Sequence, residues 1–158
     1  MKARKVKVDS DAPFADGLRA VLSVRLDELY SLAAAGEDAL HDMRIAAKRV
    51  RYVLETAEPA FGPAAKGGAK AMRQIQDVLG EIHDCDELLA LLDRHVARLR
   101  EQDAAAALAG EPLPNRRKYR GLEALRAHTV AERERLHVRF TKRWAKLEPK
   151  LATELVSA

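Results

Sequence analysis

The sequence predicts an all-α protein, and three observations lead to that class. The 158 residues are 47% apolar and 33% charged but include only eight Gly and six Pro, too few for the many turns of a β-sandwich or barrel. Apolar residues recur at steps of three and four between these breakers, as on the buried face of a helix. The breakers leave four such segments, so we predict an antiparallel four-helix bundle with connections of about 2–10 residues.

The four expected helices are separated by segments that contain Pro or Gly. They run over residues 13–35, 37–58, 69–107 and from residue 115 past residue 144. The second and third helices are expected to be joined by a loop over residues 59–68. Asn115 can cap the start of the fourth helix, and Pro149 is expected to disturb its end.

The domain organisation and compartment follow from the same pattern. We expect residues 1–11 to be a basic, flexible segment and residues 12–158 to form one helical domain. The longest apolar run, residues 104–109, is far shorter than the roughly 20 residues that cross a bilayer. Acidic residues follow the basic N-terminus where a signal peptide would be apolar, and the single Cys85 suits a reducing compartment. We therefore expect a cytoplasmic protein with no membrane segment.

Charge is distributed unevenly along the chain. The net charge is only +4, yet residues 116–143 carry ten Lys or Arg against three Glu. The third expected helix is rich in Asp and Glu and is the acidic counterpart of this segment. Arg116, Arg117 and Arg120, at the start of the basic segment, are weaker candidates for binding an anion.

The second expected helix carries a basic face opposite an apolar stripe. At 100° per residue, His41, Arg44, Lys48, Arg51 and Glu55 fall on one side. Cations at neighbouring helical positions repel one another, and only the nearby Glu55 and Asp42 can relieve this repulsion. The guanidinium fork suits a bidentate grip on phosphate, so the face is explained by an anion that bridges the cations. The alternative is that this face is simply the solvated side of the helix.

The third expected helix has a related polar face that includes Arg73, Gly80 and His83. The segments 41–52 (HDMRIAAKRVRY) and 76–86 (QDVLGEIHDCD) together resemble the two signatures of the CHAD domain family, in the same order. The members of that family are histidine-bearing α-helical domains. The resemblance spans residues 14–147.

The resemblance implies that the protein binds inorganic polyphosphate in a basic channel lined by these helices. The matching residues are His41, Arg44, Lys48 and Arg51, with Arg49 at the flank, and Arg73 and His83 on the third helix. Gly80 would allow close approach of helices, while Asp77 and Asp84 would orient cationic side chains. We expect no cofactor and no metal. We also expect no catalysis, because the acidic residues are scattered along a helix and do not form the carboxylate cluster that metal-assisted phosphoryl chemistry needs.

The family usually carries this helical unit twice, whereas the sequence has it once, so the chain resembles half of the usual architecture. We therefore expect a homodimer that completes the channel, since two-fold pairing is the commonest assembly. Targeting to polyphosphate granules, polyphosphate sensing and scaffolding would all use the same face.

Three other functions stay open at this stage. An exposed His41 could accept a phosphoryl group in a phosphotransfer module, and His41, His83 and His95 with Asp84 could bind a metal ion across helices. Sequence-independent nucleic-acid binding is compatible with a pI of about 9.3, although 4% aromatic residues provide no stacking platform.

Overall fold

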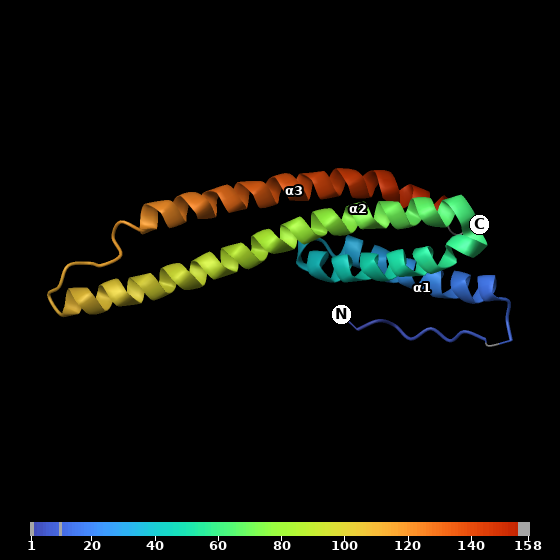
Figure 1. Ribbon diagram of the computed structural model, residues 1–158, viewed down its shortest axis with the longest axis horizontal. Coiled ribbons are helices and arrows are strands. Elements are labelled where there is room, and N and C mark those ends of the chain that lie inside the picture. The colour runs from blue at the N-terminus through green and yellow to red at the C-terminus, as the bar shows by residue number, and fades with distance from the viewer. Residues whose placement is uncertain (1, 10, 155–158) are drawn as a thin grey trace. The chain divides into compact units, whose positions relative to one another are not determined.

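The computed structural model describes residues 2–9 and 11–154, and the regular structure of these residues is entirely helical (Figure 1). Helix α1 spans Phe14–Ala34, the short 3-10 helix η1 spans Glu37–Ala39, α2 spans Leu40–Leu108 and α3 spans Tyr119–Glu154. The all-α prediction is confirmed. The predicted antiparallel four-helix bundle is not confirmed, because α2 joins the second and third expected helices directly across a kink, without the expected loop.

A sharp kink at Gly62 replaces the loop expected over residues 59–68. Gly62 has φ 56° and ψ −132°, a backbone conformation that a side chain would strain. Pro63 then begins a new helical turn, where its missing N–H costs no hydrogen bond. We call residues 40–61 the first arm of α2 and residues 63–108 the second arm. The loop prediction was wrong because one glycine followed by proline reverses the chain without any further residues.

The two arms run antiparallel after this reversal, as the cyan and green parts of the ribbon show in Figure 1. Glu55 of the first arm pairs with Arg73 of the second at 3.5 Å. Arg44 lies beside Gly80, since a Cβ added to Gly80 would be 3.7 Å from Arg44 Nε. The two segments that carry the CHAD-like signatures therefore contact each other along this hairpin.

The chain divides into two compact units, Met1–Gly80 with Arg139–Ala158 and Glu81–Val138. The core of the first unit consists of apolar residues from α1, both arms of α2 and the end of α3. Its largest members are Leu22, Leu29, Met43, Val50, Leu54, Met72, Ile75, Leu79, Phe140 and Trp144. Tyr30 contacts Trp144 edge to face, with ring centroids 6.1 Å apart. The apolar stripes predicted from periodicity form this core.

The second unit consists of the end of α2, a connecting segment and the start of α3. Its acidic and basic helices are joined by ion pairs, Arg133 with Asp86 at 2.6 Å and Arg126 with Asp93 at 2.9 Å. Part of the excess positive charge in residues 116–143 is therefore neutralised inside the unit by the acidic residues of α2.

Asn115 does not cap α3, which begins four residues later at Tyr119. Its buried side chain instead donates hydrogen bonds to the Leu99 carbonyl at 3.3 Å and to Gln102 at 3.1 Å. Its backbone N–H donates to the Asp103 carboxylate, which also accepts from the Tyr119 hydroxyl. The cap prediction was wrong because these tertiary bonds to α2 satisfy Asn115 before the helix begins. Beyond Pro149, α3 continues to Glu154.

None of the helices described is long and apolar enough to cross a membrane.

Candidate anion-binding site

The basic face of the first unit comprises Arg44, Lys48, Arg51 and Arg73, together with Tyr52 and Glu55. Arg44, Lys48, Arg51 and Glu55 lie on one side of the first arm because they recur at steps of three and four. Arg73 reaches the same place from the second arm. The hairpin at Gly62 thus brings together cations that are separated by more than a dozen residues in sequence.

Glu55 lies between the cations of the two arms. Its carboxylate accepts a hydrogen bond from Arg51 at 3.1 Å and pairs with Arg73 at 3.5 Å. Arg51 is largely enclosed, with 16% of its side chain exposed, whereas Glu55 and Arg73 are 41% and 64% exposed. The predicted relief of cation repulsion by Glu55 is confirmed, and the carboxylate occupies a position where a negative charge is stabilised from two sides.

Tyr52 adds an aromatic surface to the basic face. The Arg51 guanidinium lies 4.8 Å from the ring centroid and the Lys48 ammonium 5.7 Å from it. Such contacts restrict both cations while leaving their charges available to a further ligand. The sequence placed Tyr52 beside these cations, but the stacking depends on side-chain rotamers that it does not reveal.

Gly80 accommodates a side chain and not a second backbone. Within 4 Å of a Cβ added there, the only neighbouring group described outside its own helix is the Arg44 side chain, at an ordinary contact distance. The expectation of close helix approach at Gly80 was wrong. The glycine instead leaves space along which Arg44 lies against the second arm.

The expected orienting role of Asp77 and Asp84 falls to Glu55. Both aspartates are exposed, and among the residues described no ion pair joins either of them to a cation. Glu55 lies outside both signatures, on the first arm, and pairs with both Arg51 and Arg73. This correction follows from the reversal at Gly62, which aligns Glu55 with Arg73.

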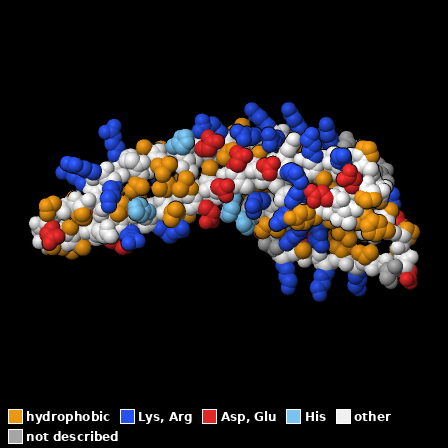
Figure 2. Space-filling view, viewed as in Figure 1, with side chains coloured by type: hydrophobic (Ala, Val, Ile, Leu, Met, Phe, Trp, Pro, Cys, Tyr) orange, Lys and Arg blue, Asp and Glu red, His pale blue; other side chains and the backbone are white. Residues whose placement is uncertain are grey.

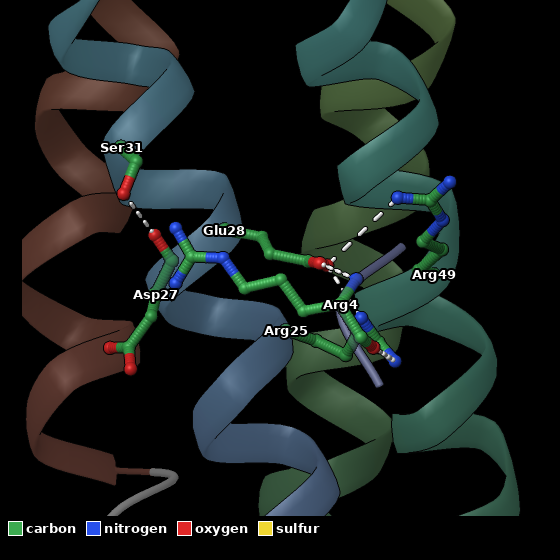
Figure 3. Close-up of polar contacts among 6 residues, drawn as sticks. All are labelled: Arg4, Arg25, Asp27, Glu28, Ser31 and Arg49. Carbon is green, nitrogen blue, oxygen red and sulfur yellow. Dashed lines mark hydrogen bonds and ion pairs between the residues drawn. The ribbon is translucent and has the colours of Figure 1, made fainter. Parts of the chain in front are cut away.

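Arg49 lies away from the basic face and belongs to a buried ionic cluster around Glu28 (Figure 3). Glu28 is 2% exposed, and its carboxylate accepts hydrogen bonds from the Arg4 backbone N–H at 2.6 Å and from Arg25 at 2.7 Å. The Arg49 guanidinium is 3.9 Å from the same carboxylate. Burial raises the pKa of Glu28, but the Arg4 bond and the charges of Arg25 and Arg49 together bring that pKa below its ordinary value.

The same cluster holds the N-terminal segment that the sequence predicted to be flexible. Arg25 donates a second hydrogen bond to the Arg4 carbonyl at 2.8 Å. Val8 lies so close to Gly17 that a Cβ there would be 2.8 Å from it. Arg4 and Val8 of this segment therefore each contact α1.

The remaining predicted site residues are placed as follows. His41 is exposed in the first turn of α2, and His83 is half-buried in the part of α2 that belongs to the second unit. Arg116 and Arg117 are exposed in the segment before α3, and Arg120 is exposed in its first turn. Of the ten candidates, His41, Arg44, Lys48 and Arg51 share one side of the first arm, and Arg73 joins this face from the second arm.

Within the described part of the chain, no three His, Cys, Asp or Glu side chains gather in a way that could hold a metal ion.

The family model for the CHAD domain matches residues 2–93, more than half of the chain. The chain belongs to the CHAD domain family. Neither a curated protein nor a solved structure matches it. Both CHAD signatures, residues 41–52 and 76–86, lie inside the matched region, and so does the whole basic face. Arg116, Arg117 and Arg120 lie outside that region.

Proposed function

We propose that this CHAD protein binds inorganic polyphosphate on the basic face, without catalysis. The observation that carries the proposal is the convergence of Arg51 and Arg73, from opposite arms of the hairpin, on one carboxylate. Membership of the CHAD family is consistent with a polyphosphate ligand. A phosphate group offers more acceptor oxygens than a carboxylate and can engage the same two guanidinium groups at once.

The ion pairs with Glu55 are weak enough to be exchanged for a ligand. Glu55 and Arg73 are both substantially exposed, and pairs of that kind contribute only about 0–1 kcal/mol because water and salt screen them. A polymer with many adjacent phosphates can contact Arg44, Lys48 and Arg51 in addition to Arg73. A single phosphate can contact only some of them, so affinity is expected to increase with chain length.

Calorimetric titration tests the function directly. Long-chain polyphosphate should bind, with an affinity that falls steeply between about 50 and 200 mM salt because counterions are released from the polymer. Triphosphate and inorganic phosphate should bind progressively more weakly. Duplex DNA at equal phosphate concentration should not displace the polymer, and ready displacement would mean a general nucleic-acid-binding surface instead. The length of the polymer should be unchanged after incubation with Mg²⁺, as expected without catalysis.

Replacing Glu55 by Gln should increase the affinity for polyphosphate by about threefold to tenfold. The substitution keeps the shape of the side chain but removes the charge that competes with the ligand for Arg51 and Arg73. Glu58→Gln is the matched control, because Glu58 pairs only loosely with Lys66 at 3.9 Å, away from Arg73. Lower affinity in Glu55→Gln than in the control would show that Glu55 positions the cations for the ligand and does not compete with it.

A second copy of the chain stays the predicted partner. Several large apolar side chains of the second unit are exposed, namely Leu91, Leu108, Leu113, Leu125 and Val138. Sedimentation velocity at micromolar concentration should therefore give a dimer. A monomer both with and without polyphosphate would contradict the expected pairing.

A further inference from the structure

A cavity in the first unit lies apart from the basic face, between the second arm of α2 and α3. Its volume is about 380 Å³, within the range of small-molecule sites. Six of its lining residues come from the second arm just after the kink, and the others come from the end of α3. It is a different surface from the one that carries Arg44, Arg51 and Arg73, none of which lines it.

The wall formed by α2 is apolar and lacks bulk. Ala64, Gly67, Gly68 and Ala71 present no side chain longer than a methyl group over two turns of helix, and Ile75 closes the inner end. A Cβ added to Gly67 would find no atom within 4 Å. The opening therefore exists because these positions lack side chains that could fill it.

The wall formed by α3 combines cations with apolar residues. Arg143, Lys146 and Lys150 follow one another at steps of three and four, which places them on one side of the helix, with Leu147 and Leu151 beside them. Figure 2 shows Lys and Arg side chains projecting along this end of α3. Arg143 donates a hydrogen bond to the Gln74 carbonyl at 3.3 Å across the cavity. Among the side chains described, no carboxylate pairs with any of the three cations.

We propose that this cavity binds a small organic anion with an apolar body, of the class of alkyl phosphates and medium-chain carboxylates. The three cations attract and hold the charged group, since none of the side chains described supplies a carboxylate that pairs with them. The apolar body lies on the wall formed by Gly67, Ala71 and Ile75 and displaces water from it. A polyphosphate chain fits this site poorly, because it has no apolar surface to exchange for the water on that wall.

Octyl phosphate below its micelle concentration is the probe, titrated into the full chain by calorimetry. We expect one site for octyl phosphate that is tighter than the weak phosphate binding on the basic face, with inorganic phosphate and octanol each binding at least about tenfold more weakly than octyl phosphate. Equal binding of inorganic phosphate would overturn the apolar part of the proposal. Equal binding of octanol would overturn the role of the cations.

Gly67→Leu should fill the cavity and weaken octyl phosphate binding by about tenfold or more, without weakening the titration with polyphosphate. The matched control is Gly121→Leu, at a second helical glycine with open space around its Cβ but outside the cavity. Unchanged octyl phosphate binding in Gly67→Leu would overturn the proposal.

A second pair of variants keeps the test independent of any folding defect in Gly67→Leu. Lys146→Glu changes an exposed residue that lines the cavity, and Lys142→Glu changes an exposed residue on the same helix that does not. Only the first should lose octyl phosphate binding. Adsorption to vesicles of anionic lipid is measured for the same variants. If both lysine variants reduce adsorption equally and Gly67→Leu does not change it, the cations form a membrane-attracting surface. That result would overturn the small-molecule site.

Discussion

Substituting Gln for both Arg51 and Arg73 is expected to weaken polyphosphate binding by about one hundredfold. Each guanidinium can make charge-assisted hydrogen bonds to phosphate worth about 1.5–3 kcal/mol, so at the lower end of that range losing two costs about 3 kcal/mol. Gln keeps the first part of the aliphatic chain and a polar end group, although the contact of the Arg51 guanidinium with the Tyr52 ring is lost. Calorimetric titration measures the change in affinity, and thermal denaturation checks that the variant is folded.

The salt dependence of the same variant separates a binding role from a structural one. Removing two phosphate contacts reduces the number of counterions released, so the slope of log affinity against log salt should become shallower by about two. A variant that merely distorts the hairpin would lose affinity without that change in slope.

The matched control is the double variant Arg98→Gln with Arg135→Gln. Both arginines are exposed in the second unit, and among the described residues the ion pair of Arg135 is with Glu132, one turn away on the same helix. The two double variants lose the same net charge. Equal loss of affinity in both would mean that overall positive charge, and not the basic face, determines binding.

The features that the sequence predicted well are those that depend on local periodicity. The apolar stripe of the first arm, with Met43, Val50 and Leu54, is buried as expected, and its polar side carries Arg44 and Arg51. The two signatures also identified the helices that contact each other. These features follow from the 3.6-residue repeat, which each helix shows without reference to the rest of the chain.

The features that the sequence missed depend on contacts between distant segments. Gly62 with Pro63 indicated a breaker, but only the packing of the two arms decides that the chain reverses at one residue. Asn115 had the residue type of a cap, yet bonds to Leu99 and Gln102 occupy its side chain. Arg49 follows Lys48 in the signature, but its guanidinium lies near Glu28 of another helix. A single sequence contains no signal for these partners.

Glu28 lies among the apolar residues of α1, and its substitution by Gln should lower the free energy of unfolding at pH 7 by about 3 kcal/mol. Gln keeps an acceptor oxygen for the Arg4 N–H but leaves Arg25 and Arg49 facing a neutral group. For a chain of this size, the melting temperature should fall by about 9 °C. Glu58→Gln, at an exposed pair, should change the stability by less than about 1 kcal/mol.

The pH dependence of the stability distinguishes the charge of Glu28 from its packing, because only the effect of the charge changes with pH. Because the pKa of Glu28 is lower in the folded protein than its ordinary value, its carboxylate contributes stability in full above that ordinary value. The contribution is lost as the pH falls through the lowered pKa, when the carboxylate becomes protonated in the folded state. The stability difference between the wild type and Glu28→Gln should therefore shrink as the pH falls from about 7 towards about 3. A difference that stays constant over that range would show that shape, and not charge, makes Glu28 stabilising.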